Sequence, residues 1–231
     1  MNPLPYLDIH SHLRKHFEHA VSVNCLSMDE IHLEKNKEKY QTAGIHPWWL
    51  EDFTSQEIEI LKSKIVALAD AGKLWAIGES GIDRTYPETL DWQKELFSWH
   101  LELSEKHQLP MVIHNVRSGS DFLEIIKKSK PSQAWIFHDF RGNEELMKSF
   151  LLMHPKSYFS FGLSIDNSQS VRDLLPMVPL SNLFLETDDQ KHLDIHDIYV
   201  RASDKIGIEV EFLKSQIWLN FKKITSSTLI S

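Results

Sequence analysis

Short apolar runs alternate along the chain with longer stretches in which apolar residues recur every three or four positions. The short runs are typical of buried strands, and the longer stretches have the spacing of amphipathic helices. Strands are expected at residues 6–12, 20–26, 42–46, 74–79, 110–114, 134–138, 157–161 and 183–188. Helices are expected at residues 55–71, 90–107, 121–128, 144–153, 196–205 and 209–223.

This alternation predicts the fold class. Strands that alternate with helices form parallel βαβ units, and eight of them in 231 residues predict an α/β fold, a (β/α)8 TIM-type barrel, regular or distorted. No repeat, low-complexity segment or linker divides the sequence, so residues 1–231 are expected to form a single domain. An open doubly wound sheet is the second choice, because no Gly-rich phosphate loop follows the first strand.

Ionisable residues end six of the eight expected strands. They are His12, His46, Glu79, His114, His138 and Asp188. The carboxyl ends of barrel strands form one face, where active sites lie, so we expect these side chains to gather there. Because side chains alternate along a strand, His10 points to the same face as His12.

The residue types at these positions predict a metal site. His10 and His12 can chelate one divalent cation, and Glu79, which is costly to bury alone, has two oxygens that can bridge two cations. We therefore expect one or two divalent cations, with zinc, manganese and magnesium all compatible with histidine and carboxylate ligands. Taken alone, His114 or His138 is better explained as a hydrogen-bonded core histidine; the six positions together favour the metal.

Composition limits the possible partners and location. The formal net charge is −8, which argues against a broad nonspecific footprint on nucleic acid but not against an enzyme that engages one chain end. A single cysteine, Cys25, excludes an internal disulfide. We find no signal-peptide pattern and no apolar run of about 18 residues, so we expect a cytoplasmic protein with no membrane contact. Nothing in the sequence points to an obligate protein partner.

Six segments occur in the order found in the TatD-like metal-dependent hydrolases, a family of the amidohydrolase superfamily. They are DIHSHL, GIHPWW, AIGESGID, LPMVIHN, IFHDFRG and LFLETDD, between residue 6 and about residue 189. The sequence resembles this family, whose usual fold is a distorted barrel. The resemblance implies that His10 and His12 form the first metal pair and that Glu79 bridges. It also implies that His114 and His138 bind the second cation, and that Asp188 binds metal and contacts the attacking water.

The same resemblance implies an activity. It points to an exonuclease-type deoxyribonuclease that cleaves phosphodiester bonds with a metal-activated water, with Asp188 and Glu79 catalytic and single-stranded DNA ends as substrate. His46 would contact the substrate phosphate or support the site. Arg84 and Arg117 are expected to hold phosphate oxygens, since guanidinium matches them bidentately. Further candidates are Arg141 and Lys191 for phosphate, and Trp48, Trp49 and Phe140 for base stacking, although surface exposure or packing explains each equally well.

The departures from the family pattern lie in the loops. Arg117 follows His114 by three residues where the family has two, and the segment after Asp188 lacks the family's proline. These loops would contact substrate, so substrate choice stays open, as do DNA against RNA, strand polarity and oligomeric state.

Two other functions compete. The first is an amidohydrolase acting on a small ester, lactone or amide. It is disfavoured because the fourth expected strand ends in Glu79 and has no lysine after Lys73. The second is a catalytically idle metal-binding protein, which the complete set of expected ligands disfavours.

Overall fold

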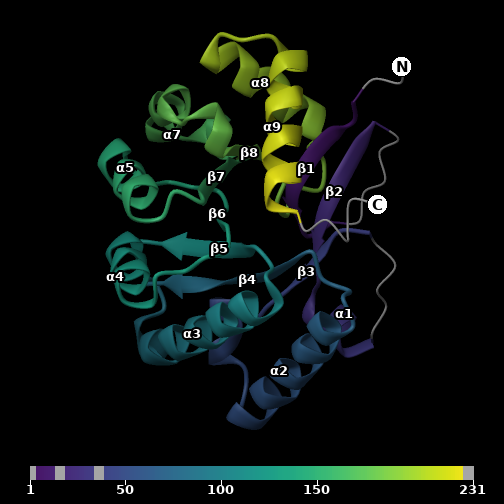
Figure 1. The fold of residues 1–231 in the computed structure, drawn as a ribbon, viewed down its shortest axis with the longest axis vertical. Coiled ribbons are helices and arrows are strands. Elements are labelled where there is room, and N and C mark those ends of the chain that lie inside the picture. The colour runs from purple at the N-terminus through teal and green to yellow at the C-terminus, as the bar shows by residue number, and fades with distance from the viewer. Residues whose placement is uncertain (1–3, 14–18, 34–38, 226–231) are drawn as a thin grey trace.

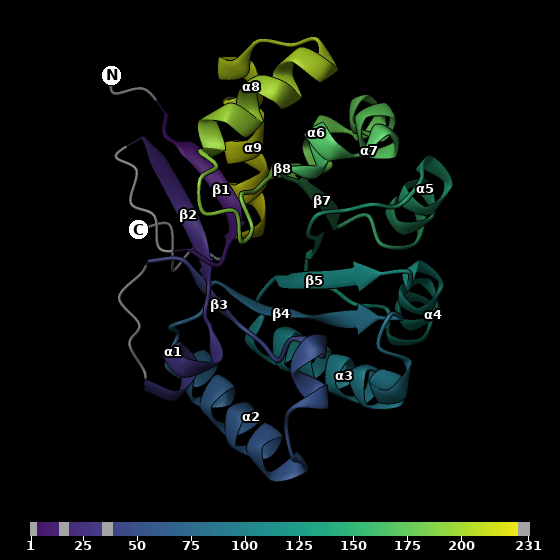
Figure 2. The same ribbon diagram turned by 180° about the vertical axis from the view of Figure 1, so that it is seen from behind.

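Eight parallel strands form one sheet that curls into a nearly closed barrel with helices outside it (Figures 1 and 2). The computed structural model describes residues 4–13, 19–33 and 39–225. The strands are β1 (Tyr6–Ser11), β2 (Ala20–Cys25), β3 (Gln41–Ala43), β4 (Ala76–Asp83), β5 (Met111–Val116), β6 (Trp135–Phe137), β7 (Ser157–Phe161) and β8 (Leu183–Leu185). They pair in chain order, which confirms the predicted barrel.

The ring closes between its first and last strands just beyond the end of β8. The backbone N–H of His12 donates to the carbonyl of Asp188 at 3.1 Å, and the Asp188 N–H donates to the carbonyl of His10 at 3.0 Å. These two bonds bring Asp188 against β1 at the carboxyl-end face of the barrel.

The helices cover the outside of the sheet. They are α1 (Met28–Leu33), α2 (Ser55–Asp70), α3 (Leu90–His107), α4 (Gly119–Ser129), α5 (Glu144–Met153), α6 (Ser164–Asn167), α7 (Gln169–Leu174), α8 (Ile195–Ile206) and α9 (Val210–Ile224). All six expected helices are present within two residues of their expected ends. The expectation missed α1, α6 and α7, because an apolar repeat of 3.6 residues cannot be recognised in six residues or fewer.

Helix α2 illustrates why these elements form. Its apolar positions Ile58, Leu61 and Ile65 are buried, as their spacing predicts. Its first turn carries a capping box, in which the N–H of Glu57 donates to the Thr54 hydroxyl and the N–H of Thr54 donates to the Glu57 carboxylate. Such a cap contributes about 1 kcal/mol, so the start of α2 is set locally.

Several strand ends differ from the prediction: β3 and β8 end three residues early, before His46 and Asp188, and β4 and β5 end late. Strand β4 continues past Glu79 to Asp83, and β5 continues past His114 to Val116, where the two strands stay paired. The pairing register shifts between Ile77 and Ser80, an irregularity that an apolar run followed by an ionisable residue does not reveal. Glu79 therefore lies inside a strand rather than at its end.

The core consists of apolar side chains from the sheet and its covering helices. Phe137 on β6 stacks on Phe150 of α5 at a ring-centroid distance of 4.3 Å and on Phe159 of β7 at 5.9 Å. Among the described residues, no helix is long and apolar enough to cross a membrane.

Candidate metal centre

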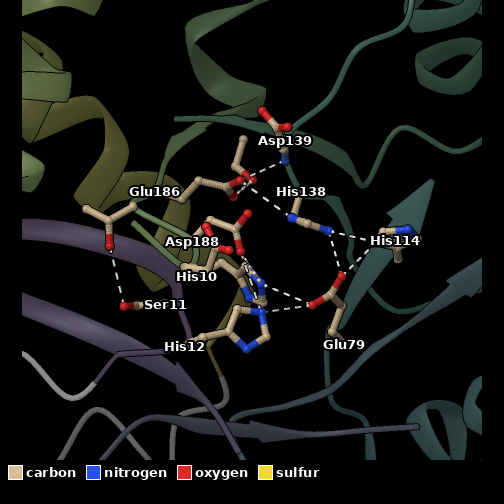
Figure 3. Close-up of polar contacts among 12 residues, drawn as sticks. His10, Ser11, His12, Glu79, His114, His138, Asp139, Glu186 and Asp188 are labelled. Atoms are coloured by element: carbon tan, nitrogen blue, oxygen red, sulfur yellow. Dashed lines mark hydrogen bonds and ion pairs between the residues drawn. The ribbon is translucent and has the colours of Figure 1, made fainter. Parts of the chain in front are cut away.

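Histidines from four parts of the barrel converge on one buried carboxylate, Glu79 of β4, which is 3% exposed. Figure 3 shows four of these histidines, His10, His12, His114 and His138, around Glu79. The histidines come from β1 and the residue after it, from the segment after β3, from β5 and from the residue after β6. They are His10, His12, His46, His114 and His138. The structure thus brings every predicted histidine together.

One oxygen of Glu79 faces three imidazoles. Its Oε1 atom lies 2.7 Å from Nε2 of His138, 2.9 Å from Nδ1 of His114 and 3.1 Å from Nε2 of His46. The His114 nitrogen is in turn 3.2 Å from that of His46 and 3.3 Å from that of His138. Three nitrogens and one oxygen therefore converge on one small volume.

The other oxygen faces the first strand. Glu79 Oε2 lies 3.1 Å from Nε2 of His12 and 3.3 Å from Nε2 of His10. Asp188 completes this side, with Oδ1 3.5 Å from the His12 nitrogen and 3.6 Å from the His10 nitrogen. The two oxygens of one carboxylate thus address two separate groups of ligand-type atoms.

Glycines allow the backbone of β4 to lie where Glu79 needs it. Gly78 has φ +130°, and a Cβ there would lie 2.3 Å from the carbonyl oxygen of Val112 on β5. A Cβ at Gly44, after β3, would lie 2.4 Å from the carbonyl oxygen of Glu79. Neither position tolerates a side chain, so these glycines are required for the close approach of the three segments.

Further carboxylates hold the histidines from behind. Asp83 Oδ2 lies 3.2 Å from Nε2 of His114, and Glu186 Oε1 lies 3.5 Å from Nδ1 of His138. Glu186 is fully buried and also accepts hydrogen bonds from the N–H of Asp139, at 2.8 Å, and from a serine hydroxyl. Such partners set the tautomer and orientation of metal-binding histidines.

The carboxylate of Asp8, on β1, contacts Thr187 and not one of the histidines. Its carboxylate accepts hydrogen bonds from the N–H and the hydroxyl of Thr187, at 3.0 and 2.6 Å. Burial raises the pKa of Asp8 to about 7, although the bonds from Thr187 oppose the rise. Asp8 therefore positions the residue directly before Asp188.

The electrostatics of the centre show that the imidazoles balance one negative charge. Burial alone would raise the pKa of Glu79, but the surrounding His138, His46, His10 and His114 hold it well below its usual range. Burial lowers the pKa of His46, and the neighbouring His114 and His138 add to this; Glu79 and Glu186 raise the pKa of His138 in spite of its burial. A divalent cation binds the neutral imidazole and the ionised carboxylate, and it would replace these shared protons.

Unpartnered nitrogens support the fit to a cation. Among the described residues, neither ring nitrogen of His10 has a partner in hydrogen-bonding geometry, although this side chain is completely buried. Buried polar atoms are normally hydrogen-bonded, so such a nitrogen requires a partner of another kind. In the described part of the chain, three groups of side chains have their ligand atoms within 4.8 Å of one another: His10 with His138 and Asp188, His10 with His12 and Glu79, and His46 with Glu79 and His114.

A cavity of about 620 Å³ opens over this centre. Its lining residues include Trp48 and Trp49, which the sequence offered for base stacking, and Arg141, which it offered for phosphate binding. Arg84 and Arg117 are not among them. The Arg84 guanidinium instead donates to Asp121 at 2.7 and 2.9 Å. The substrate contacts of Arg84 and Arg117 therefore stay predictions.

Sequence reasoning missed two residues of this site. Cys25, the last residue of β2, lines the cavity. Burial alone would lower the pKa of His12, but its contacts with Cys25 and Glu79 raise it to about 11. The rule that found the histidines, an ionisable residue near a strand's carboxyl end, would also have found Cys25. Asp83 was missed because β4 was expected to stop at Glu79.

A sequence model of the family described as TatD related DNase matches residues 8–225, nearly the whole chain. The chain belongs to this family. Among its members, an uncharacterised metal-dependent hydrolase, TatD, of Mycobacterium tuberculosis is 24% identical over 161 residues, 67% of this chain and 60% of the relative. A protein of a Pantoea species named 3′-5′ ssDNA/RNA exonuclease TatD is 29% identical over 161 residues, 64% of this chain and 57% of the relative.

Solved structures of TatD homologues share the fold. The structure of YjjV from Escherichia coli superposes with a TM-score of 0.81 at 17% identity, over 95% of this chain and 97% of that one. A TatD-family hydrolase from Entamoeba histolytica gives a TM-score of 0.74 at 16% identity, over 96% and 98% of the two chains. In the sequence matches, the chain spans less than two thirds of the length of the curated relatives.

Proposed function

We propose that this TatD-family protein is a metal-dependent hydrolase, an exonuclease-type deoxyribonuclease that cleaves phosphodiester bonds at single-stranded ends. The observation that carries the proposal is Glu79, whose two oxygens face two separate groups of histidine and carboxylate atoms. Two adjacent cation positions joined by one carboxylate are an arrangement used for in-line displacement at phosphorus. The Pantoea relative is named as an exonuclease of single-stranded DNA and RNA, which supports a nucleic-acid substrate.

The chain offers one set of ligands for each cation. Four residues, His10, His12, Glu79 and Asp188, would hold the first, and Glu79, His114 and His138 would hold the second, with His46 beside it. A bound divalent cation supplies Lewis acidity, which lowers the pKa of water and neutralises charge on phosphoryl oxygens. Zinc, manganese and magnesium all suit this mixture of ligands, and the proposal includes one or two of them.

Asp188 performs the proton transfer in this proposal. Its carboxylate is 31% exposed, whereas Glu79 is 3% exposed, so of these two candidate ligands Asp188 is the more accessible to a water molecule in the cavity. Its backbone is fixed to β1 by two hydrogen bonds, which keeps the carboxylate in place. Asp188 would orient the attacking water and accept its proton, the role of a general base.

Arg141 lines the cavity, and its guanidinium can bind a phosphate there. It is 65% exposed and pairs with Asp139, directly after His138, at 2.6 Å. A guanidinium at the cavity rim matches the phosphate oxygens of an entering chain end. Contacts from His46, Arg84 and Arg117 to the substrate remain part of the proposal. A cytoplasmic location and the lack of an obligate partner remain predictions.

One experiment tests the function directly. Metal-depleted protein is incubated with single-stranded DNA and RNA of equal sequence, labelled at the 3′ or the 5′ end, with manganese, magnesium or zinc added back in turn. We expect stepwise shortening of DNA that depends on added metal and is lost in His10→Ala. Cleavage that persists after chelation would contradict the metal mechanism. Hydrolysis of small esters or amides with intact oligonucleotides would instead establish the amidohydrolase alternative.

A further inference from the structure

Trp48 exposes a large aromatic side chain at the cavity over Glu79. It lies in a short 3-10 helix (Pro47–Glu51) directly after His46, and half of its surface, 50%, is accessible. Of the large apolar side chains that are exposed in the described part of the chain, Trp48 alone lines the cavity over Glu79. Large aromatic side chains usually bury their surface, so an exposed ring at a cavity indicates a contact with something else.

The indole ring is held in one orientation. Its Nε1–H donates to Oδ2 of Asp83 at 2.7 Å, and this buried carboxylate also accepts from the N–H of Thr85 at 2.8 Å. The ring of Tyr86 lies 6.1 Å from that of Trp48 at an interplanar angle of 35°. Because its single polar atom is already bonded, the accessible part of Trp48 is an apolar ring surface.

This surface is adjacent to the candidate metal ligands. The rings of His46 and His114 meet Trp48 in edge-to-face arrangements, with centroid distances of 4.8 and 5.6 Å. Asp83 contacts both the Trp48 indole and Nε2 of His114, so one carboxylate positions the exposed ring and a metal ligand together. A group stacked on Trp48 is therefore a near neighbour of a group bound at Glu79.

We propose that Trp48 is a stacking platform for the base of the nucleotide whose phosphate lies at the Glu79 centre. The inference rests on the proposed nuclease function and specifies its substrate: an unpaired, unstacked nucleobase, recognised by its π-face. Aromatic stacking accepts every base, and the indole has no free donor for reading a base edge, so binding is independent of sequence. A base inside a duplex is already stacked on its neighbours, so the platform selects single strands.

Trp49 provides an internal comparison. It also lines the cavity, but it is only partly exposed and packs against the core cluster that contains Leu50 and Ile58. Its ring lies farther from His46, at 6.3 Å. Trp49 therefore supports the segment, and Trp49→Phe serves as the matched control for Trp48→Phe and Trp48→Ala.

The test compares two substrates in each variant. One is a single-stranded oligonucleotide with a normal terminal nucleotide, and the other carries an abasic residue at the same place. For the wild type we expect KM about tenfold lower on the normal substrate, equivalent to about 1.4 kcal/mol of stacking. In Trp48→Ala this difference should disappear, with kcat within about threefold of the wild type. Trp48→Phe should keep most of it, and Trp49→Phe all of it.

Each other outcome has a definite meaning. Cleavage by the wild type with equal KM for normal and abasic substrates would overturn the stacking proposal and leave the nuclease function standing. Loss of kcat or of bound metal in Trp48→Ala, with the base preference retained, would assign Trp48 to support of His114 and also overturn it. Failure of the wild type to cleave any oligonucleotide with any metal would overturn the proposed function and this inference together.

Discussion

Two buried carboxylates in this protein are balanced in different ways. Glu79 lies among imidazoles at the carboxyl-end face of the barrel, and Asp121, in α4, is 6% exposed and lies between Arg84 and Lys94, at 2.7 and 2.9 Å. In both cases burial alone would raise the pKa, and the surrounding groups lower it instead. The geometry around Asp121 is that of a structural ion pair.

The difference lies in whether the partners can lose their charge. Arginine and lysine stay positive at neutral pH, so Asp121 is neutralised permanently and gains nothing from a metal ion. Imidazole titrates near neutral pH, so the partners of Glu79 can give up their protons to become ligands. A carboxylate ringed by histidines can exchange its protons for a cation, whereas one ringed by arginine and lysine cannot.

The strongest test removes the carboxylate at the centre. In Glu79→Gln we expect metal-dependent cleavage to fall at least ~100-fold, because loss even of outer-shell partners costs metal sites about 10–100-fold. Added manganese should raise the melting temperature of the wild type, since a ligand at 100 times its Kd stabilises by about 2.7 kcal/mol. It should not raise that of the variant. Asp121→Asn is the control, and equal loss of metal in both variants would contradict the comparison.

The next test removes the structural carboxylate. Asp121→Asn should lower the free energy of unfolding at pH 7 by about 1–2 kcal/mol, since its hydrogen bonds to charged groups are partly screened by solvent. The pKa of Asp121 in the folded protein is below its ordinary value of 3.8. The stabilisation is therefore complete above about pH 4 and is lost as the pH falls through the folded-state pKa. Urea unfolding of both proteins at pH 7 and pH 3 measures this, and a difference that grows toward acid would contradict it.

Two arginines extend the comparison to the substrate. Arg141→Ala should raise KM for single-stranded DNA about threefold to tenfold and reduce the salt dependence of binding, because a phosphate contact is lost. Arg84→Ala should lower thermal stability and raise KM less than Arg141→Ala does, because its guanidinium is bonded to Asp121. Steady-state kinetics at two salt concentrations distinguish these effects. A larger KM change in Arg84→Ala would restore Arg84 as the main phosphate contact.

The smallest effect concerns Lys94, the second positively charged side chain beside Asp121. Lys94 is 40% exposed and makes a single contact, so Lys94→Met should cost about 0.5 kcal/mol or less of unfolding free energy. Its cleavage kinetics should equal those of the wild type, and differential scanning calorimetry measures the stability. A loss as large as that in Asp121→Asn would show that Lys94, rather than Arg84, balances Asp121.

Local patterns in the sequence predicted much of the fold and brought together the side chains of the candidate metal centre. The helix at 90–107 and the strand at 157–161 have their expected bounds, because their apolar spacing is a local property. The five histidines and Glu79 were found because a parallel barrel brings the carboxyl ends of its strands together, whatever the distance along the chain. One topological rule therefore converted scattered residues into a site.

What escaped prediction depends on contacts between distant segments. The ion pair of Arg84 escaped prediction, because its partner Asp121 is 37 residues away on another element and no local pattern indicates the pair. The extension of β4 beyond Glu79 depends on its pairing with β5. The anchoring of Trp48 by Asp83 likewise requires two segments that meet only in the folded barrel.

The closure of the barrel has a consequence for biosynthesis. Asp8 and Thr187, which are hydrogen-bonded, are 179 residues apart, and the carboxylate of Asp188 next to them faces histidines of the first strand. A nascent polypeptide therefore lacks a complete centre until β8 and Asp188 have been translated and have docked against β1, a contact that spans most of the chain. For a protein with the proposed activity, this order keeps unfinished chains inactive toward the nucleic acids around the ribosome.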